Sequence, residues 1–198
     1  EIFTLKAIEI DPNYAMAYFN LGNIRKDLGK RKDSLDSYLR VIEINPQYVY
    51  TFSAITDLLR YSDPSQFDKN YLKKILNLCL NKKDLSHKDL FPAFNFLYKN
   101  DLITNLEKSG GIFSKIDLIT NHKSIMNALE KIIFCDPELE KVLKSFRRDI
   151  CNRVSKKGND INEYELEFII GLGKQCFINE YVYSVSKEEN INLQNSIE

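Results

Sequence analysis

The sequence predicts an all-α protein, and three observations support that fold class. The 198 residues include only seven glycines and five prolines, which are too few for a turn-dense β protein. Apolar residues recur at helical spacing through most of the chain. The segment AIEIDPNYA at residues 7–15 returns as VIEINPQYV at residues 41–49, a shift of 34 residues. Because that period is typical of helix–turn–helix repeats, we expect an α-solenoid that continues into an irregular helical domain.

Composition and charge narrow the classes of function. Lysine and arginine together number 28, and so do aspartate and glutamate, which gives a formal net charge of zero. A balanced charge argues against a nucleic-acid-binding surface. No run of the sequence approaches the length of apolar residues that a membrane span needs. We therefore expect a cytoplasmic protein with no nucleic-acid partner and no membrane partner.

One complete repeat lies between Pro12 and Pro46. Its first helix should carry an apolar face formed by Tyr14, Tyr18, Leu21 and Leu28. Its second helix should carry an apolar stripe formed by Leu35, Tyr38, Val41 and Ile42. Gly22 should lie where the two helices cross closely, because a side chain would hold them apart. Gly29 should end the first helix in the left-handed conformation that suits glycine, and Pro46 should end the second.

This unit resembles a tetratricopeptide repeat, and the NLGN run at 20–23 and the DLGK turn at 27–30 strengthen the resemblance. Residues 1–11 resemble the closing helix of a preceding repeat. Residues 48–61 resemble the first helix of a following repeat, although Thr56 stands at the position of the crossing glycine. The resemblance therefore implies one complete repeat flanked by two partial ones.

The repeat pattern stops near residue 62, so we expect repeats over residues 1–62 and a helical extension over residues 63–198. The triplet Ser-Gly-Gly at 109–111 is a candidate break within this extension. The helices expected in the extension cover 65–81, a segment that begins near 86, 123–134, 137–155 and 163–183, followed by an amphipathic stretch from 186.

Two helix starts in the extension have specific signals. Ser86 followed three residues later by Asp89 resembles a capping box. Pro92 then permits either a kink or a later helix start near Ala93. Asp136 should cap a helix that begins with a proline at residue 137.

Residues 123–189 carry a second resemblance. Its motifs are LEKIIFCDPELEKVLKSFRRDI and IIGLGKQCFINEYVYSVSKEE, and the most distinctive stretch is QCFINEYVY at 175–183. These motifs resemble the helical block that precedes a class I S-adenosylmethionine-dependent methyltransferase domain in bacterial repeat proteins. The resemblance implies that such a domain follows this block in a longer protein, and that the present chain holds no cofactor.

The cysteines and histidines do not form the pattern of a metal site. The cysteines lack the paired spacing of zinc ligands, and the sequence has only two histidines. We expect the cysteines to be reduced residues of the core on helices, at Cys79, Cys135, Cys151 and Cys176. The histidines, His87 and His122, should lie at the surface. The sequence therefore predicts no metal.

Three further features invite a chemical interpretation. Gly171-x-Gly173 lacks the third glycine of a nucleotide-binding loop, so close helix packing is the better interpretation. Asn179 and Glu180 lie in an apolar run, where the carboxylate is either a perturbed acid or an ordinary hydrogen-bonding or solvent-facing group. The basic stretch at 141–157 is interleaved with acidic residues, which predicts a solvated helix face.

The repeat resemblance implies a binding surface on the first helices of the repeats. Its inward-facing residues would be Met16, Phe19, Asn20, Asn23, Lys26, Asp27, Tyr50, Ser53 and Asp57, with Ala54 beside them. Asparagines such as Asn20 and Asn23 offer both a donor and an acceptor to a peptide backbone. Ala54 interrupts this ladder, and the basic clamp that some repeats of this kind use for a terminal carboxylate is absent. The alternative is that these side chains only solvate a concave face.

We therefore expect a scaffold that binds a protein or a peptide and serves as the non-catalytic arm of a larger transferase. Two alternatives stay open. In the first, the chain is a helical part of a methyltransferase and contributes directly to its active site. In the second, it is a purely structural linker. No catalytic residue is expected within the chain itself.

Overall fold

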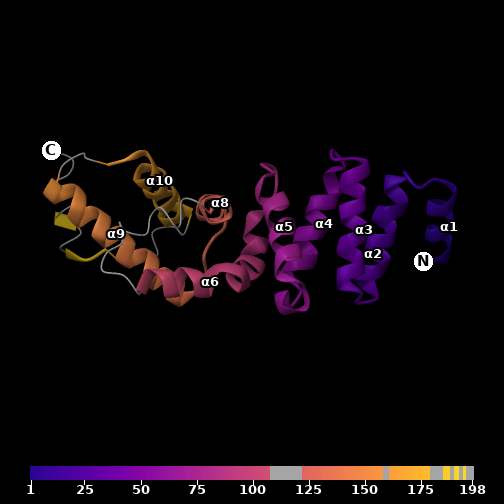
Figure 1. The fold of residues 1–198 in the computed structure, drawn as a ribbon, viewed down its shortest axis with the longest axis horizontal. Coiled ribbons are helices and arrows are strands. Elements are labelled where there is room, and N and C mark those ends of the chain that lie inside the picture. Colours follow the sequence, from indigo (N-terminus) through magenta and orange to yellow (C-terminus); the bar gives the residue numbers. More distant parts are fainter. Residues whose placement is uncertain (108–121, 158–160, 179–184, 188–189, 192–193, 195–198) are drawn as a thin grey trace. The chain divides into compact units, whose positions relative to one another are not determined.

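The computed structural model describes residues 1–107, 122–157 and 161–178, together with 185–187, 190, 191 and 194 (Figure 1). All of the regular secondary structure in these residues is helical, which confirms the all-α fold class. The chain separates into two compact units, Glu1–Ala93 and Phe94–Glu198. The expected division at residue 62 was inferred from the repeat pattern and stays a prediction. The expected break at 109–111 lies outside the described residues.

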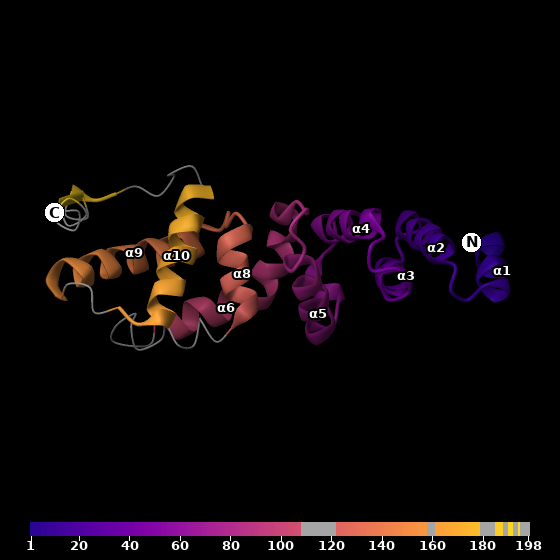
Figure 2. The ribbon, with the colours of Figure 1, turned by 90° about the horizontal axis from the view of Figure 1, so that it is seen from above.

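The first unit consists of helical hairpins. Its elements are α1 (Ile2–Ile10), α2 (Ala15–Asp27), α3 (Arg31–Ile44), α4 (Val49–Arg60), the 3-10 turn η1 (Pro64–Gln66), α5 (Lys69–Leu80), η2 (His87–Leu90) and the beginning of α6 (Phe91–Glu107). Helices α2 and α3 lie side by side and form the most extensive helix pair of this unit (Figures 1 and 2). This pair is the complete repeat that the sequence predicts.

Gly22 lies at the crossing of α2 and α3, as expected. A Cβ atom built on Gly22 would lie 2.6 Å from Cδ1 of Tyr38, and closer still to Cε1 of the same ring. The Ser34 hydroxyl donates a hydrogen bond of 2.8 Å to the Gly22 carbonyl, which ties the two helices together at this point. The crossing therefore depends on glycine.

Gly29 ends α2 in the left-handed conformation, with φ of 73°. Its N–H donates to the Lys26 carbonyl at 3.0 Å, and the next N–H, of Lys30, donates to the Arg25 carbonyl at 2.9 Å. This is the Schellman arrangement, in which otherwise unpaired carbonyls of the last helical turn accept hydrogen bonds. The expected role of Gly29 is confirmed.

The expected apolar faces are only partly correct. On α3, Leu35, Tyr38 and Val41 are completely buried. On α2, Leu21 is buried, but Tyr14 and Leu28 are exposed. Tyr14 and Leu28 are the N-cap and C-cap residues of α2, so their side chains leave the helix face that the spacing predicts. The buried residues of α2 and α3 therefore lie within these helices and not at the caps of α2.

The start of α6 differs from the expectation. Ser86 precedes the 3-10 turn η2, and its side chain makes no capping hydrogen bond. Asp89 instead lies 3.3 Å from the Arg60 guanidinium. Helix α6 begins at Phe91, so Pro92 lies within its first turn, where the missing N–H of proline has no helical partner to lose. The later start near Ala93 is therefore wrong.

The described part of the second unit contains the rest of α6, α8 (Lys123–Lys131), α9 (Pro137–Lys157) and α10 (Glu163–Ile178). Aromatic rings form much of its core: Phe94 and Phe134 lie 4.8 Å apart between centroids, and Phe146 and Phe168 lie 5.7 Å apart. Helix α8 ends three residues earlier than predicted, because the backbone of Ile132 is extended. The segment 179–183, which was expected to continue α10, lies outside the described residues.

Asp136 caps α9 as predicted. Its Oδ1 accepts hydrogen bonds from the backbone N–H groups of Glu138 and Leu139, at 3.0 and 3.1 Å. Its Oδ2 lies 2.6 Å from Nζ of Lys99. Burial alone would raise the pKa of the Asp136 carboxyl, but the hydrogen bonds from Lys99 and the two amides outweigh burial and hold that pKa below its usual value.

The glycine pair of α10 lies within a continuous helix, as expected, but only Gly171 packs against another helix, because a Cβ atom on Gly173 would meet nothing within 4 Å. A Cβ atom on Gly171 would be in ordinary contact with Leu129 of α8, at 3.5 Å. Beside it, the buried Gln175 donates from Nε2 to the carbonyls of Leu129 and Ile132, at 3.0 and 2.7 Å, and accepts from the Phe134 N–H at 3.1 Å. Gln175 therefore donates hydrogen bonds to backbone carbonyls at the end of α8, where the last carbonyls have no partner within the helix.

The cysteine prediction is correct in part. None of the four cysteines forms a disulfide, and Cys79 and Cys151 are buried. Cys135 is exposed, because α8 ends at residue 131 and leaves this cysteine in the connection to α9 rather than on a helix. His122 is exposed, as expected, whereas His87 is half-buried in η2.

Candidate functional site

Helices α2 and α4 place the predicted binding residues on neighbouring stretches of the first unit. We call the following residues the α2–α4 surface: Met16, Phe19, Asn20, Asn23, Lys26, Asp27, Tyr50, Ser53 and Asp57. A direct contact joins its two halves, because Nζ of Lys26 lies 3.4 Å from Oδ2 of Asp57, a residue 31 positions further along the chain. Residues of two successive hairpins therefore meet at this contact, while the binding role of the surface stays a prediction.

Aromatic rings form a second connection between the hairpins. The ring centroids of Phe19 and Tyr48 lie 5.3 Å apart, and those of Tyr48 and Tyr50 lie 6.2 Å apart. Phe19 also lies 5.7 Å from the buried ring of Tyr38. Tyr48 was not among the predicted site residues. Its signal in the sequence is the run Tyr48-Val49-Tyr50, three large side chains that directly follow the turn at Pro46.

The two asparagines of the surface are not equivalent. Asn20 is exposed. Asn23 is half-buried, and its Oδ1 accepts a hydrogen bond of 2.7 Å from the hydroxyl of Tyr38. That bond leaves the amide nitrogen of Asn23 as a donor and uses one of the two lone pairs of its amide oxygen. Of the two, Asn20 therefore retains the full donor and acceptor pair that was expected to bind a peptide backbone.

Tyr38 is a buried residue that bonds the Asn23 side chain of this surface. Burial raises the pKa of Tyr38, and the negative charges of Asp27 and Asp57 raise it further, while a hydrogen bond with Ser34 opposes them. The phenol is protonated at neutral pH with or without this shift, and it donates its hydrogen bond to Asn23. Tyr38 therefore lies against Gly22 with its ring and bonds Asn23 with its hydroxyl.

Large apolar side chains are exposed at and beside this surface. Tyr50 is 70% exposed, Met16 is 47% exposed, and Val49, the first residue of α4, is 77% exposed. The Tyr14 hydroxyl donates to Sδ of Met16 at 3.8 Å. Exposed apolar groups that gather on one face are typical of surfaces that bind another molecule.

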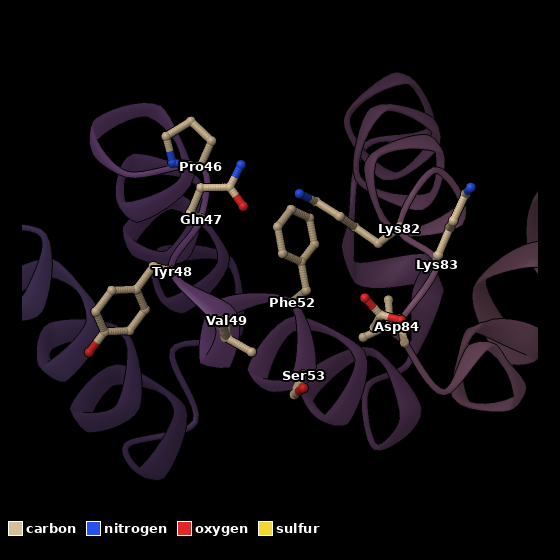
Figure 3. A pocket seen from close by; sticks show the side chains of 10 residues that line it. Pro46, Gln47, Tyr48, Val49, Phe52, Ser53, Lys82, Lys83 and Asp84 are labelled. Carbon is tan, nitrogen blue, oxygen red and sulfur yellow. The ribbon is translucent and has the colours of Figure 1, made fainter.

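A pocket of about 150 Å³ opens beside the α2–α4 surface (Figure 3). We call it the α4–α5 pocket. Its lining residues are Pro46, Gln47, Tyr48, Val49, Phe52, Ser53, Lys82, Lys83, Asp84 and Leu85. Of these, only Ser53 was predicted as a site residue. Residues 82–85 were missed because they belong to the loop after α5, which has no helical periodicity. Nζ of Lys82 lies 4.5 Å from the centroid of the Phe52 ring.

Within residues 1–107, 122–157 and 161–178, no group of three or more His, Cys, Asp or Glu side chains is placed to hold a metal ion. Burial raises the pKa of the Cys79 thiol to about 12, which disfavours the nucleophilic thiolate. In the same part of the chain, none of the helices has both the length and the apolar character of a membrane span. Asn179 and Glu180 lie outside the described residues.

Comparison with known families agrees with the hairpin geometry. Residues 3–34 match the family model of the tetratricopeptide repeat. The match covers most of α1, all of α2 and the beginning of α3. No curated protein and no solved structure matches the chain. Tetratricopeptide repeats generally mediate contacts between proteins, and the match supports a repeat of this kind in the first unit.

Proposed function

We propose that the α2–α4 surface binds an extended segment of a partner protein. The observation that carries this proposal is the joining of two successive hairpins into one surface, through the contact of Lys26 with Asp57 and the ring contact of Phe19 with Tyr48. A surface that spans two hairpins can follow a peptide over several residues, whereas one helix offers only a short contact.

The side chains of this surface suit a peptide in two ways. Tyr50 and Met16 are exposed and offer apolar contact area. Asn20 can both donate to and accept from a peptide group, which binds the backbone independently of the peptide sequence. Lys26 and Asp57 partly neutralise each other at 3.4 Å, and Asp27 leaves the charged side chains of the surface with one net negative charge. A moderately apolar, extended segment is therefore the proposed ligand.

A selection from a random peptide library displayed on phage would test this proposal. The purified chain should select peptides, and their affinity can be measured by fluorescence anisotropy. Tyr50→Ala should weaken a selected peptide by about 1–3 kcal/mol, as the loss of a central aromatic contact does at protein interfaces. Tyr164→Ala is the matched control, because Tyr164 is an exposed tyrosine on α10 of the second unit. Equal binding by wild type and Tyr50→Ala would assign the peptide to another surface.

We further propose that the chain is the non-catalytic arm of a larger transferase. The support is the resemblance of residues 123–189 to the block that precedes a methyltransferase domain. In the described part of this block, Gln175 bonds the end of α8, and Glu165 accepts from the Asn162 N–H at 3.0 Å in the cap of α10. Polar groups used in this way stabilise helices, which favours a supporting role over a direct part in an active site. A structural linker without a ligand remains the alternative if the library selects nothing.

A further inference from the structure

The α4–α5 pocket has two walls of different character. One wall is the turn at Pro46 with the first turns of α4, and it contributes the apolar side chains of Pro46, Val49 and Phe52. The other wall is the loop after α5, which contributes Lys82 and its neighbours up to Leu85. Figure 3 shows Phe52 between the two walls, with the Lys82 side chain reaching across toward its ring.

The size of the pocket corresponds to one large side chain. An apolar cavity of about 150 Å³ is large enough to bind benzene. The α4–α5 pocket has the same volume and is open on one side, so a phenylalanine or leucine side chain can enter it from a peptide. Burial of such a side chain against Phe52 and Val49 would remove apolar surface of both partners from water.

The pocket has a positively charged side chain on one side and a negatively charged side chain on the other. Nζ of Lys82 lies over Phe52, on the side of Pro46 and Gln47, while Lys83 points away from the ring (Figure 3). Asp84 lies on the side of Ser53. Among the described residues, no carboxylate oxygen lies within 4.0 Å of Nζ of Lys82. The ammonium group at the mouth of the pocket is thus available to a carboxylate of a ligand.

We propose that the α4–α5 pocket receives a large apolar side chain, phenylalanine or leucine, from a peptide in which the adjacent residue is acidic. The apolar side chain packs on Phe52, and the neighbouring carboxylate pairs with Lys82. This inference rests on the proposed peptide binding and adds a subsite to it, because Ser53 belongs to both the pocket and the α2–α4 surface. The partner is therefore an acidic and apolar segment rather than a basic one.

Three fluorescein-labelled peptides test the chemistry of this subsite. They are GSGSEFEGSG, its variant with alanine for phenylalanine, and its variant with lysine for both glutamates. Fluorescence anisotropy should show that the first peptide binds about fivefold or more tightly than either variant. The measurement is made at low ionic strength, because exposed ion pairs are weak and are screened by salt. Equal binding of the alanine variant, or tighter binding of the lysine variant, would overturn the proposal.

Substitutions at Lys82 test the position of the subsite. Lys82→Met keeps the apolar stem beside Phe52 but removes the charge, and should weaken the acidic peptide about fivefold. Lys82→Glu should reverse the preference, so that the lysine variant of the peptide binds more tightly than the glutamate peptide. Lys74→Met is the matched control, because Lys74 is exposed on α5 and does not line the pocket. Circular dichroism of each variant verifies that the helices are intact.

The same measurements separate this inference from the proposed function. If Tyr50→Ala weakens the library-selected peptides while both Lys82 variants bind the three probe peptides like wild type, peptide binding by the α2–α4 surface is supported and the pocket subsite is refuted. If the acidic preference follows Lys82 but Tyr50→Ala has no effect on the selected peptides, the pocket binds its ligand without that surface. If neither residue matters, both proposals are wrong.

Discussion

Replacing Gly22 by alanine should destabilise the first unit by about 1–3 kcal/mol, because the new methyl group would overlap the Tyr38 ring. The built Cβ lies 2.6 Å from Cδ1 of Tyr38, and ordinary carbon contacts begin near about 3.5 Å, so the ring has to move by about 1 Å. Tyr38 has little room to do so, since it is completely buried and bonds Asn23 at 2.7 Å. The better helix propensity of alanine, worth about 1 kcal/mol, only partly offsets this cost.

Urea denaturation followed by circular dichroism measures this cost. Gly173→Ala is the matched control, because Gly173 is exposed within α10 and a Cβ there meets nothing within 4 Å. That control should be neutral or stabilising by up to about 1 kcal/mol. In a Tyr38→Leu background, which removes the ring, Gly22→Ala should cost much less. An equal cost in both backgrounds would show that the overlap with Tyr38 is not the cause, and the argument for the crossing would fail.

Other experiments test two polar contacts and the proposed non-catalytic role of the chain. Asn23→Ala should cost about 1–3 kcal/mol of stability because it leaves the buried Tyr38 hydroxyl without its acceptor, while Asn20→Ala should cost almost nothing. Asp136→Asn keeps the helix cap but loses the ion pair with Lys99. Because folding lowers the pKa of Asp136, its charge contributes stability above the unfolded pKa of about 4, and the contribution is lost as the pH falls through the folded pKa. The stability gap between wild type and Asp136→Asn, measured by urea denaturation, should therefore be present at pH 7 and closed at strongly acidic pH. Titration of the chain with S-adenosylmethionine should give no measurable heat, and micromolar binding would contradict the non-catalytic role.

Local rules of sequence predict the parts of this fold that depend on a few neighbouring residues. The left-handed Gly29, the cap at Asp136 and the 34-residue repeat need only short-range patterns, and the structure confirms the first two directly. The early end of α8 and the uncapped Ser86 show the limit of such rules. In both places contacts from elsewhere in the chain decide the outcome, as when Asp89 lies beside Arg60 instead of completing a capping box.

The candidate site was predictable where it follows the repeat register and not where it depends on packing. The repeat register assigned Lys26 and Asp57 to one surface, and in the structure Nζ of Lys26 lies 3.4 Å from Oδ2 of Asp57. Tyr48 was missed because it is the N-cap of α4 and lies outside the periodic part of the helix. The second wall of the pocket was missed because residues 82–85 belong to a loop, whose position relative to Phe52 depends on how α5 packs.

The bond between Tyr38 and Asn23 changes how the α2–α4 surface should be understood. In sequence, Asn23 is one of two asparagines that could bind a peptide, and Tyr38 is only a core residue of the second helix. In the structure, the ring that requires glycine at position 22 also fixes the amide at position 23 through its hydroxyl. Core packing and the binding surface are therefore coupled through one side chain. A substitution that moves Tyr38 should weaken ligand binding as well as folding, whereas Tyr50→Ala should affect binding alone, because Tyr50 is 70% exposed.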